Sequence, residues 1–226
     1  MNKYKLFLFS VALYSFHIEL LSSVIDELIY DKKNLKIEIF ATDIDSPRQL
    51  AQGDDGRVYV GSRRSGKIFA LTDSDRNGIA DSKELVAENL TFATGVSLYE
   101  GDLYFSEIDK IWKIEKIGSQ LDSNLEDLPD KILVSDDLPD DEWHGWKWLQ
   151  HDHIGNLYTN VGAPCNVCLS DDKRHATILK FSNNAWSIIA RGVRNSVGLI
   201  FIRFRKNYFL QIMVETGLEM TPHPAS

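Results

Sequence analysis

The sequence predicts an all-β fold assembled from β-propeller blades. Three stretches share one pattern, in which a glycine turn, a strand with a central Tyr, a short loop and an alternating strand around Ile follow one another. The central residues, Tyr59, Tyr104 and Tyr158, lie 45 and 54 residues apart. Repeats of this length with several short strands are typical of propeller blades, and each blade needs neighbours to bury its faces. Helical periodicity is best over Ile18–Ile29 and is otherwise nearly absent.

Composition limits the classes of protein that fit. The 226 residues include 43% hydrophobic and 26% charged residues, which is typical of a folded soluble domain. The 33 Asp and Glu outnumber 25 Lys and Arg, and the net charge of -8 argues against a nucleic-acid partner. No segment reaches the roughly 20 uninterrupted apolar residues that cross a bilayer, which excludes a bundle of transmembrane helices.

The first residues have the pattern of an export signal. Lys3 and Lys5 precede an apolar run over Leu6–Tyr14, which is too short to span a bilayer comfortably. We therefore predict a signal peptide over residues 1–23 and a periplasmic or secreted protein. An apolar N-terminal strand or helix is the alternative.

The middle of the chain predicts paired strands in each repeat. Residues alternate over Lys67–Leu71 and Lys110–Ile114, as in strands with one buried face. In the third repeat, Ala176–Phe181 follows after an insertion. Residues 119–142 contain nine acids and one Lys, and we interpret them as a solvated connection with one strand over Lys131–Val134 or as a merely acidic surface loop.

The first candidate site is the segment from Asp141 to Trp148, which contains His144, Lys147 and three Trp. The flat face of Trp suits a pocket wall for a ring-shaped ligand. An imidazole can take up a proton at neutral pH, so His144 is a candidate catalytic base. The alternative is a core histidine held by a backbone carbonyl.

The second candidate site is Gly192–Gly198, where Arg194 and Asn195 stand between glycines. A guanidinium and an amide suit the carboxylate and carbonyl oxygens of a ligand. A turn with a surface Arg is the alternative.

The only two cysteines, Cys165 and Cys168, form a lone C-x-x-C. Zinc would need two further ligands, and a thioredoxin-type motif would need a βαβ setting, which is missing. For an exported chain, the best interpretation is a small local disulfide that stiffens a long insertion between strands.

An acidic run matches the EF-hand calcium loop in full. Its oxygen-bearing residues suit a hard cation, but a strand precedes the loop where an EF-hand has a helix. A metal-free hairpin turn is therefore the alternative. The candidate ligands are Asp73, Asp75, Asn77, Asp81 and Glu84.

Together these residues resemble one family, the pyrroloquinoline-quinone-dependent sugar dehydrogenases of the glucose/sorbosone type. The resemblance covers about Ile37 to Leu199, and the run Gly162–Cys168 is most similar to the L-sorbosone dehydrogenase branch. The segments that carry it are Ser46–Ala51, Val58–Arg63, Asp73–Asp81, Leu138–Pro139, His144–Trp146, Gly162–Cys168 and Gly192–Gly198.

The resemblance implies a six-bladed β-propeller with pyrroloquinoline quinone (PQQ) in a central pocket and calcium that partly seats it. His144 matches the base that removes the proton from a sugar hydroxyl, and Arg194 and Asn195 match the pair that holds the quinone oxygens. We therefore expect these three side chains to face one hollow. The implied partners are a small sugar, oxidised at a hydroxyl or hydrated aldehyde, and an external electron acceptor, a quinone or a cytochrome.

Two departures from the family pattern affect these expectations. Ala163 stands where the glucose-dehydrogenase branch has Asp, so a carboxylate that orients His144 must come from elsewhere, or the site works differently. After Leu199 the family pattern stops, and we hypothesise a frameshift or early stop near codon 199. We expect a partial propeller of three to three and a half blades over residues 30–199, an aberrant tail without a blade pattern over 200–226, and little dehydrogenase activity.

Two other classes remain open, a calcium-dependent propeller hydrolase of the lactonase type and a non-catalytic propeller fragment that binds partners. No Glu/Asn/Asp ligand set is visible at the pocket end of the blades, which disfavours the lactonase. The G-x-S-x-G and H-E-x-x-H signatures of common hydrolases do not occur.

Overall fold

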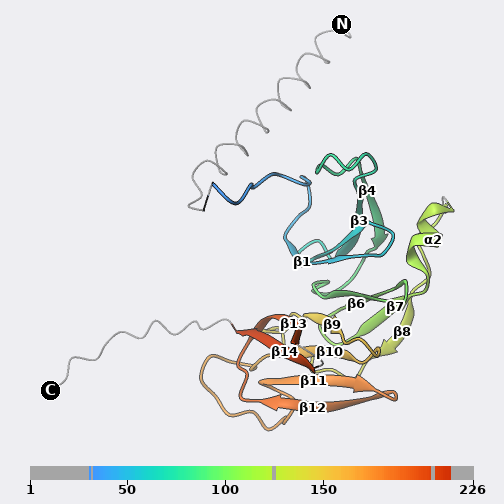
Figure 1. The fold of residues 1–226 in the computed structure, drawn as a ribbon. Coiled ribbons are helices and arrows are strands. Elements are labelled where there is room, and N and C mark those ends of the chain that lie inside the picture. The colour runs from blue at the N-terminus through green and yellow to red at the C-terminus, as the bar shows by residue number, and fades with distance from the viewer. Residues whose placement is uncertain (1–30, 32, 124–125, 205–206, 215–226) are drawn as a thin grey trace, which may run out of the picture.

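Three four-stranded antiparallel sheets follow one another along the chain, and a two-stranded hairpin comes after them (Figure 1). The computed structural model describes residues 31, 33–123, 126–204 and 207–214. The predicted signal peptide, residues 1–23, and the helical window Ile18–Ile29 lie outside the described residues. The protein is an incomplete β-propeller, so the predicted all-β class is confirmed.

Each sheet has its strands in chain order, which is the arrangement of a propeller blade. The first blade consists of β1 (Pro47–Gln52), β2 (Val58–Ser62), β3 (Lys67–Thr72) and β4 (Ser82–Ala87). The second consists of β5 (Val96–Tyr99), β6 (Asp102–Ser106), β7 (Ile111–Ile114) and β8 (Ile132–Ser135). The third consists of β9 (Leu149–His151), β10 (Leu157–Val161), β11 (Thr177–Ser182) and β12 (Ala185–Arg191).

The three repeated Tyr residues occupy equivalent places in the blades. Tyr59, Tyr104 and Tyr158 each lie in the second strand of their sheet. The strand expected at Lys131–Val134 is β8, shifted by one residue. The helix α2 (Ile117–Asp122) was not predicted and fills the connection between β7 and β8. Within the described part of the chain, no helix is long and apolar enough to cross a membrane.

Buried polar side chains join the first strands of the three blades. β1 contacts β5, and β5 contacts β9. The Gln49 side chain, 2% exposed, accepts hydrogen bonds from the backbone N–H groups of Val96 and Leu149, at 3.2 and 3.0 Å, and donates to the Leu149 carbonyl at 2.7 Å. A buried amide with several partners fixes one arrangement, because losing any partner leaves a buried polar group unsatisfied.

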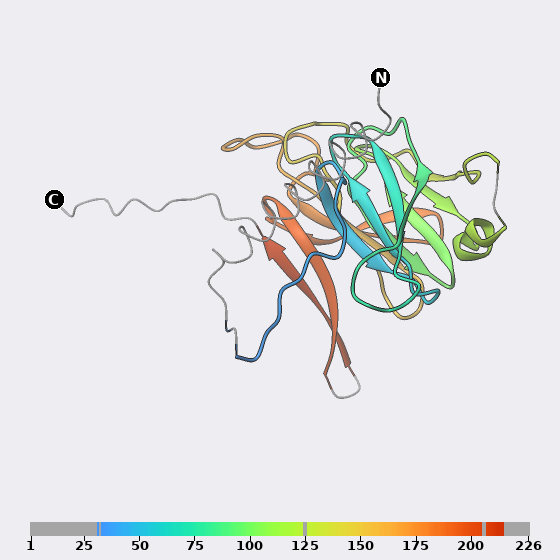
Figure 2. The ribbon, with the colours of Figure 1, turned by 90° about the horizontal axis from the view of Figure 1, so that it is seen from above.

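A hairpin follows the third blade. We expected an aberrant tail over 200–226, and β13 (Ser196–Phe204) pairs there with β14 (Asn207–Val214) in an antiparallel hairpin of two strands, which is not a complete blade. β13 also contacts β9 and β10, so it takes the place of a first strand beside the third blade. Seen from above, the red hairpin lies at one side of the blades (Figure 2). The β-branched and aromatic residues of this segment favour strands whatever their origin.

Candidate functional site

The candidate site residues lie in connections at one end of the blades. In an antiparallel blade, the connection after the second strand and the connection after the fourth strand leave from the same end. His144 lies between β8 and β9, and Arg194 and Asn195 lie between β12 and β13. The β10–β11 loop, residues 162–176, lies between them in the sequence and reaches the same end.

His144 is held by the main chain of the β10–β11 loop. Its Nδ1 lies 2.8 Å from the carbonyl oxygen of Ala163. A carbonyl can only accept, so Nδ1 carries the proton and Nε2 keeps its lone pair. Among the described residues, Nε2 has no hydrogen-bond partner, and the ring is half-buried against Trp143, with centroids 5.7 Å apart. A peptide carbonyl therefore holds this ring, as in the alternative interpretation of a core histidine, and among the described residues no carboxylate orients it.

Close main-chain packing explains the glycines around His144. His144 has a φ of 54°, a conformation that costs a residue with a side chain some strain. A Cβ at Gly162 would lie 2.4 Å from the Cβ of His144, and a Cβ at Gly145 would lie 2.2 Å from the carbonyl oxygen of Asp141. Glycine at 162 lets the β10–β11 loop approach His144, and glycine at 145 lets the chain turn against the carbonyl of Asp141.

Arg194 contacts the β10–β11 loop through both its main chain and its side chain. Its carbonyl oxygen accepts a hydrogen bond from the N–H of Ala163 at 2.7 Å. Its guanidinium Nη2 donates to the Asn166 side-chain oxygen. Ala163 therefore bridges His144 and Arg194 through its peptide groups, donating to one residue and accepting from the other.

The predicted shared hollow is not observed among the described residues, and the space beside His144 is too small to admit a water molecule. The hollow beside His144 is lined by residues of the β8–β9 and β10–β11 connections, and neither Arg194 nor Asn195 belongs to it. Asn195 is 1% exposed. The lining residues are Pro139, Asp141, Trp143, His144, Gly145, Lys147, Val161, Gly162 and His175. The structure thus places the backbones of the three candidates together without bringing their side chains into one cavity.

Lys147 is a buried cation in this hollow. Its side chain donates to the carbonyl oxygen of Gly145 at 2.6 Å, and the residue is 2% exposed. Burial lowers the pKa of Lys147 to about 7, while the charges of Asp109 and Asp141 act in the opposite direction. The ammonium group therefore supports the turn at His144 and Gly145, and its charge changes near neutral pH.

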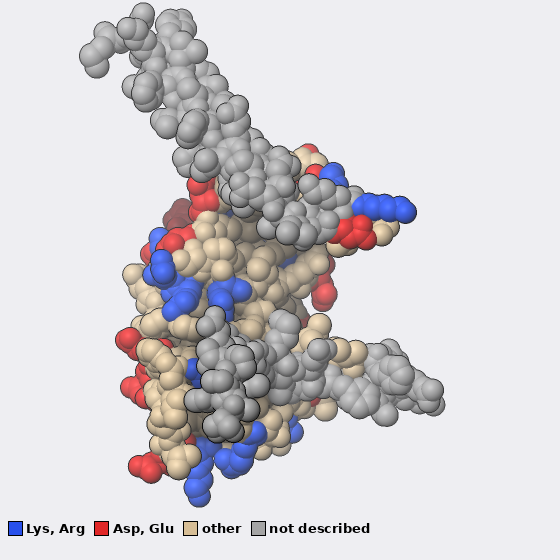
Figure 3. Space-filling model, turned by 90° about the vertical axis from the view of Figure 1, so that its left-hand side faces the viewer, with Lys and Arg blue, Asp and Glu red and all other residues tan. Residues whose placement is uncertain are grey.

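Two arginines lie next to Trp146, an arrangement that was not expected from the sequence. The Arg63 guanidinium lies 3.7 Å from the centre of the Trp146 ring, and the Arg48 guanidinium lies 5.7 Å from it. Pro47 pairs with Ser62, so both arginines stand at the same end of the first blade, the end of the second-strand connections. Basic side chains also gather near the middle of one face of the molecule (Figure 3). Arg48 lies in the candidate run Ser46–Ala51, but Trp146 is distant in the sequence, so the contact between them was not predicted.

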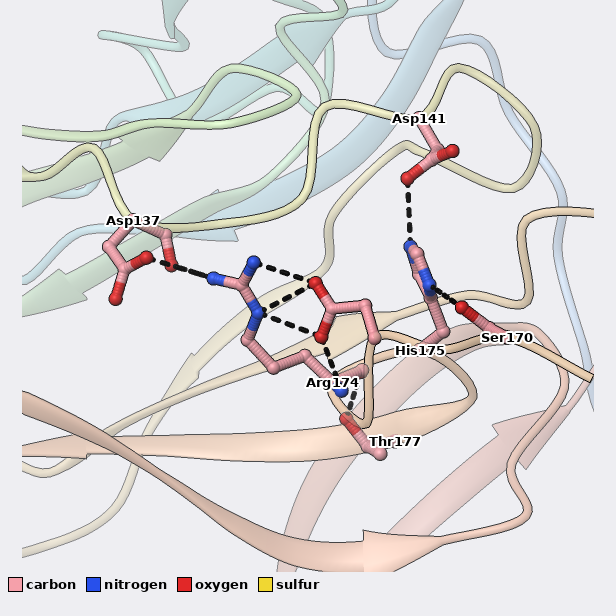
Figure 4. A network of polar contacts seen from close by, with 7 residues as sticks. Asp137, Asp141, Ser170, Arg174, His175 and Thr177 are labelled. Atoms are coloured by element: carbon pink, nitrogen blue, oxygen red, sulfur yellow. Dashed lines mark hydrogen bonds and ion pairs between the residues drawn. The ribbon is translucent and has the colours of Figure 1, made fainter.

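A polar network ties the β10–β11 loop to the connection that carries His144 (Figure 4). His175 lies between Asp141 and Ser170, at 2.8 Å from the Asp141 carboxylate and 2.6 Å from the Ser170 hydroxyl. Arg174 contacts Asp137 at 2.8 Å and Asp172 at 2.7 Å. The Arg174 side chain lowers the pKa of Asp172 to about 2. No sequence pattern predicted these contacts, because the partners come from different connections.

Cys165 and Cys168 form a disulfide with their Cα atoms 6.0 Å apart. The four-residue ring lies in the β10–β11 loop, the long insertion between strands of the third blade. Asn166, the residue that receives Arg194, is inside this ring.

The acidic run lies at the opposite end of the first blade, in the β3–β4 connection. Oxygen atoms of Asp73, Asp75 and Asp81 lie within 4.8 Å of one another, and in the described part of the chain they are the one such group of acidic, His or Cys side chains. Glu84 is not among them, which corrects the expected ligand set. It lies in β4 opposite Ala70 and lines a separate hollow with Leu121 and Pro129. An EF-hand needs a helix to return its twelfth residue to the ion, and a strand does not do so.

Known structures with the same fold include an enzyme domain that binds a quinone. The PQQ domain of pyranose dehydrogenase from Coprinopsis cinerea matches 70% of this chain, with a TM-score of 0.57 and 16% identity. An enzyme of carbohydrate-active family AA12 from Trichoderma reesei matches 72%, with a TM-score of 0.58 and 17% identity. The chain spans 41% and 44% of those two proteins. At these identities, the likeness establishes the propeller fold.

Sequence comparison adds one relative. No family model matches the chain. An uncharacterized protein of Borreliella burgdorferi is 29% identical over 175 residues, which are 74% of this chain and 44% of that protein. The chain therefore spans less than half the length of the curated relative that it matches.

Proposed function

We propose that this chain belongs to a PQQ-dependent oxidoreductase that oxidises the hydroxyl or hydrated aldehyde of a sugar, in the manner of a sorbosone or aldose dehydrogenase. The observation that carries the proposal is the hydrogen bond from His144 Nδ1 to the Ala163 carbonyl. It leaves Nε2 as an acceptor in a half-buried setting beside Trp143, which is what a general base for a hydroxyl requires.

Several residues at this end of the blades have the chemistry that the proposed cofactor requires, although they do not line one cavity. PQQ is a flat aromatic quinone that carries carboxylates, and such a ligand is recognised by guanidinium groups and by the faces of aromatic rings. Arg48, Arg63 and Arg194 supply three guanidinium groups, and Trp146 supplies a ring that already lies against two of them. These residues would hold the quinone.

The chemistry divides between the cofactor and this chain. When bound, the quinone supplies the acceptor for the hydride that leaves the sugar carbon. His144 Nε2 takes the proton of the same hydroxyl, so the substrate loses H⁺ and H⁻ and a C=O bond forms. The Ala163 carbonyl stabilises the imidazolium that results, because it accepts from Nδ1 in both charge states. Arg194 supplies positive charge for the oxygens of the ligand.

Calcium has a different role in this proposal from the one that the family resemblance implied, which was to help seat the quinone. The carboxylates of Asp73, Asp75 and Asp81 suit a hard cation, but their loop lies at the far end of β3. We propose a structural ion there, in a chain that is exported and passes electrons to an external quinone or cytochrome.

The hydrolase alternative is not favoured by this arrangement. A metal-dependent lactonase needs several oxygen ligands beside its base, and among the described residues the group of three carboxylates is at the other end from His144. The hydrogen bond to the Ala163 carbonyl would also suit a structural histidine in a propeller fragment that only binds partners, and PQQ binding distinguishes the two.

The decisive experiment is a titration of the 226-residue chain with PQQ in the presence of calcium, followed by quinone absorbance. We expect saturable binding, weakened about a hundredfold by Arg194→Ala, which is about 2.7 kcal/mol. Because an incomplete propeller should have little dehydrogenase activity, addition of an aldose should bleach the bound quinone only slowly, in a single turnover. The proposal fails if PQQ shows no saturable binding, or if calcium alone supports lactone hydrolysis that is lost with His144→Gln.

A further inference from the structure

The disulfide loop contains a residue that contacts the candidate cofactor arginine. Asn166 lies between Cys165 and Cys168, and its side-chain oxygen accepts a hydrogen bond from Arg194, 28 residues further along the chain. A guanidinium has five N–H donors, so the remaining donors stay available for a ligand. Asn166 therefore binds one donor of Arg194 and leaves the others for a ligand.

Both ends of Arg194 are fixed to the same loop. Its main-chain carbonyl accepts from Ala163, at 2.7 Å, and its guanidinium donates to Asn166. A free arginine side chain has many rotamers, and a ligand that binds it must restrict them. An arginine that is already held in one rotamer loses less on binding, so its affinity for an anion is higher.

Apolar packing does not hold the tip of the loop. Val167 is 96% exposed and Leu169 is 101% exposed, and Asn166 is exposed as well. Burial therefore cannot fix the position of Asn166. The loop is restrained instead by the disulfide between Cys165 and Cys168, which enclose Asn166. Further along the loop, the contacts of Ser170 and His175 restrain it.

We propose that Asn166 is a positioning residue, fixed by the Cys165–Cys168 disulfide, that holds the Arg194 guanidinium ready for an anionic ligand. This inference rests on the proposed function only for the identity of the ligand, PQQ. The geometric part, that Asn166 orders Arg194, concerns the free protein. The proposal gives the disulfide a role in ligand affinity in addition to stiffening the insertion.

The first test is a double-mutant cycle on PQQ affinity, measured with the full chain and calcium. We expect Asn166→Ala to weaken binding about tenfold and Arg194→Ala about a hundredfold. Because Asn166 acts through Arg194, the double variant should be within about twofold of Arg194→Ala alone. Fully additive losses would overturn the proposal. Val167→Ala, in the same ring but without a partner contact, should stay within about twofold of the wild type.

The second test needs no cofactor. Phenylglyoxal modifies free guanidinium groups, and mass spectrometry can follow the rate at Arg194. We expect modification to be severalfold faster in Asn166→Ala and in the Cys165→Ser/Cys168→Ser double variant than in the wild type. Asn166→Asp, which keeps an acceptor, should restore the slow rate, and Val167→Ala should not change it.

The two tests separate the inference from the proposed function. If the wild type does not bind PQQ but Asn166→Ala accelerates modification of Arg194, the proposed function fails and the positioning role stands. If PQQ binds and Asn166→Ala changes neither the affinity nor the rate of modification, the positioning role is wrong. A far-UV circular dichroism spectrum and a melting curve for each variant show whether the fold is retained.

Discussion

The two ends of the blades use charged residues in opposite ways. At the end that carries His144, several side chains are held by atoms of other connections, as His144 is by the Ala163 carbonyl and His175 by the Asp141 carboxylate. At the other end, the acidic loop holds itself: Asp73 accepts from the N–H of Gly78 at 2.9 Å, and Asp81 accepts from the N–H of Ser74 at 2.7 Å. Local contacts of this kind make a turn, whereas contacts between connections make a site that depends on the whole fold.

The largest expected effect distinguishes the two ends by rate. His144→Gln should slow single-turnover bleaching of bound quinone by an aldose at least about a hundredfold, because an amide cannot act as the base. Asp81→Asn, at the other end, should leave this rate unchanged. Stopped-flow absorbance measures both. Equal losses in the two variants would mean that the ends are not functionally distinct.

Gly162→Ala should lower stability more than a glycine substitution at the other end of the blades. Its Cβ would lie 2.4 Å from the Cβ of His144, so the loop must shift, at about 1–3 kcal/mol. Gly78→Ala is the matched control at the other end, since it has a positive φ and no atom within 4 Å of the added Cβ. It should cost about 1 kcal/mol, from the backbone alone. Urea unfolding of both variants decides whether close packing distinguishes the ends.

The pH dependence of stability should identify the buried cation of the His144 end. Burial lowers the pKa of Lys147 to about 7 from an ordinary value of 10.5, so between these pH values the unfolded chain binds more protons than the folded one. The contribution of Lys147 to the free energy of unfolding therefore rises as the pH increases from 7 towards 10. In Lys147→Met, the rise measured by urea unfolding should be smaller. An unchanged slope would show that Lys147 titrates normally.

The smallest effect should come from calcium. If the acidic loop binds the ion, millimolar calcium should raise the melting temperature by a few degrees, by preferential binding to the folded state. The shift should disappear in Asp73→Asn, and the bleaching rate should not change in that variant. A shift that persists in Asp73→Asn, or that appears in the rate instead, would place the ion elsewhere.

Local patterns predicted the blades and the segments that reach the site. Turn glycines and period-two alternation depend on neighbouring residues, so they identified the three repeats correctly, and Cys165 and Cys168 form the disulfide that their spacing favoured. The segments of His144 and Arg194 were also predicted to be close, and their backbones are. What failed was the direction of individual side chains, since it depends on contacts with distant residues.

The most complete motif gave the least reliable site. The run from Asp73 to Glu84 fits the calcium-loop spacing at every position, but strand alternation directs Glu84 to another surface. The contact between Ala163 and His144 had the opposite problem, because Ala163 makes it with its main-chain oxygen, which every residue type has. The burial of Lys147 was not predicted either, because a lysine next to tryptophans in the sequence is equally consistent with a surface position.

Because Ala163 acts through its peptide group, the identity of its side chain matters little to the His144 end. Serine, valine or another residue with an N–H would serve as well there, and proline alone would remove the link to Arg194. The sequence feature that marks this contact is Gly162, because an added Cβ there would collide with His144.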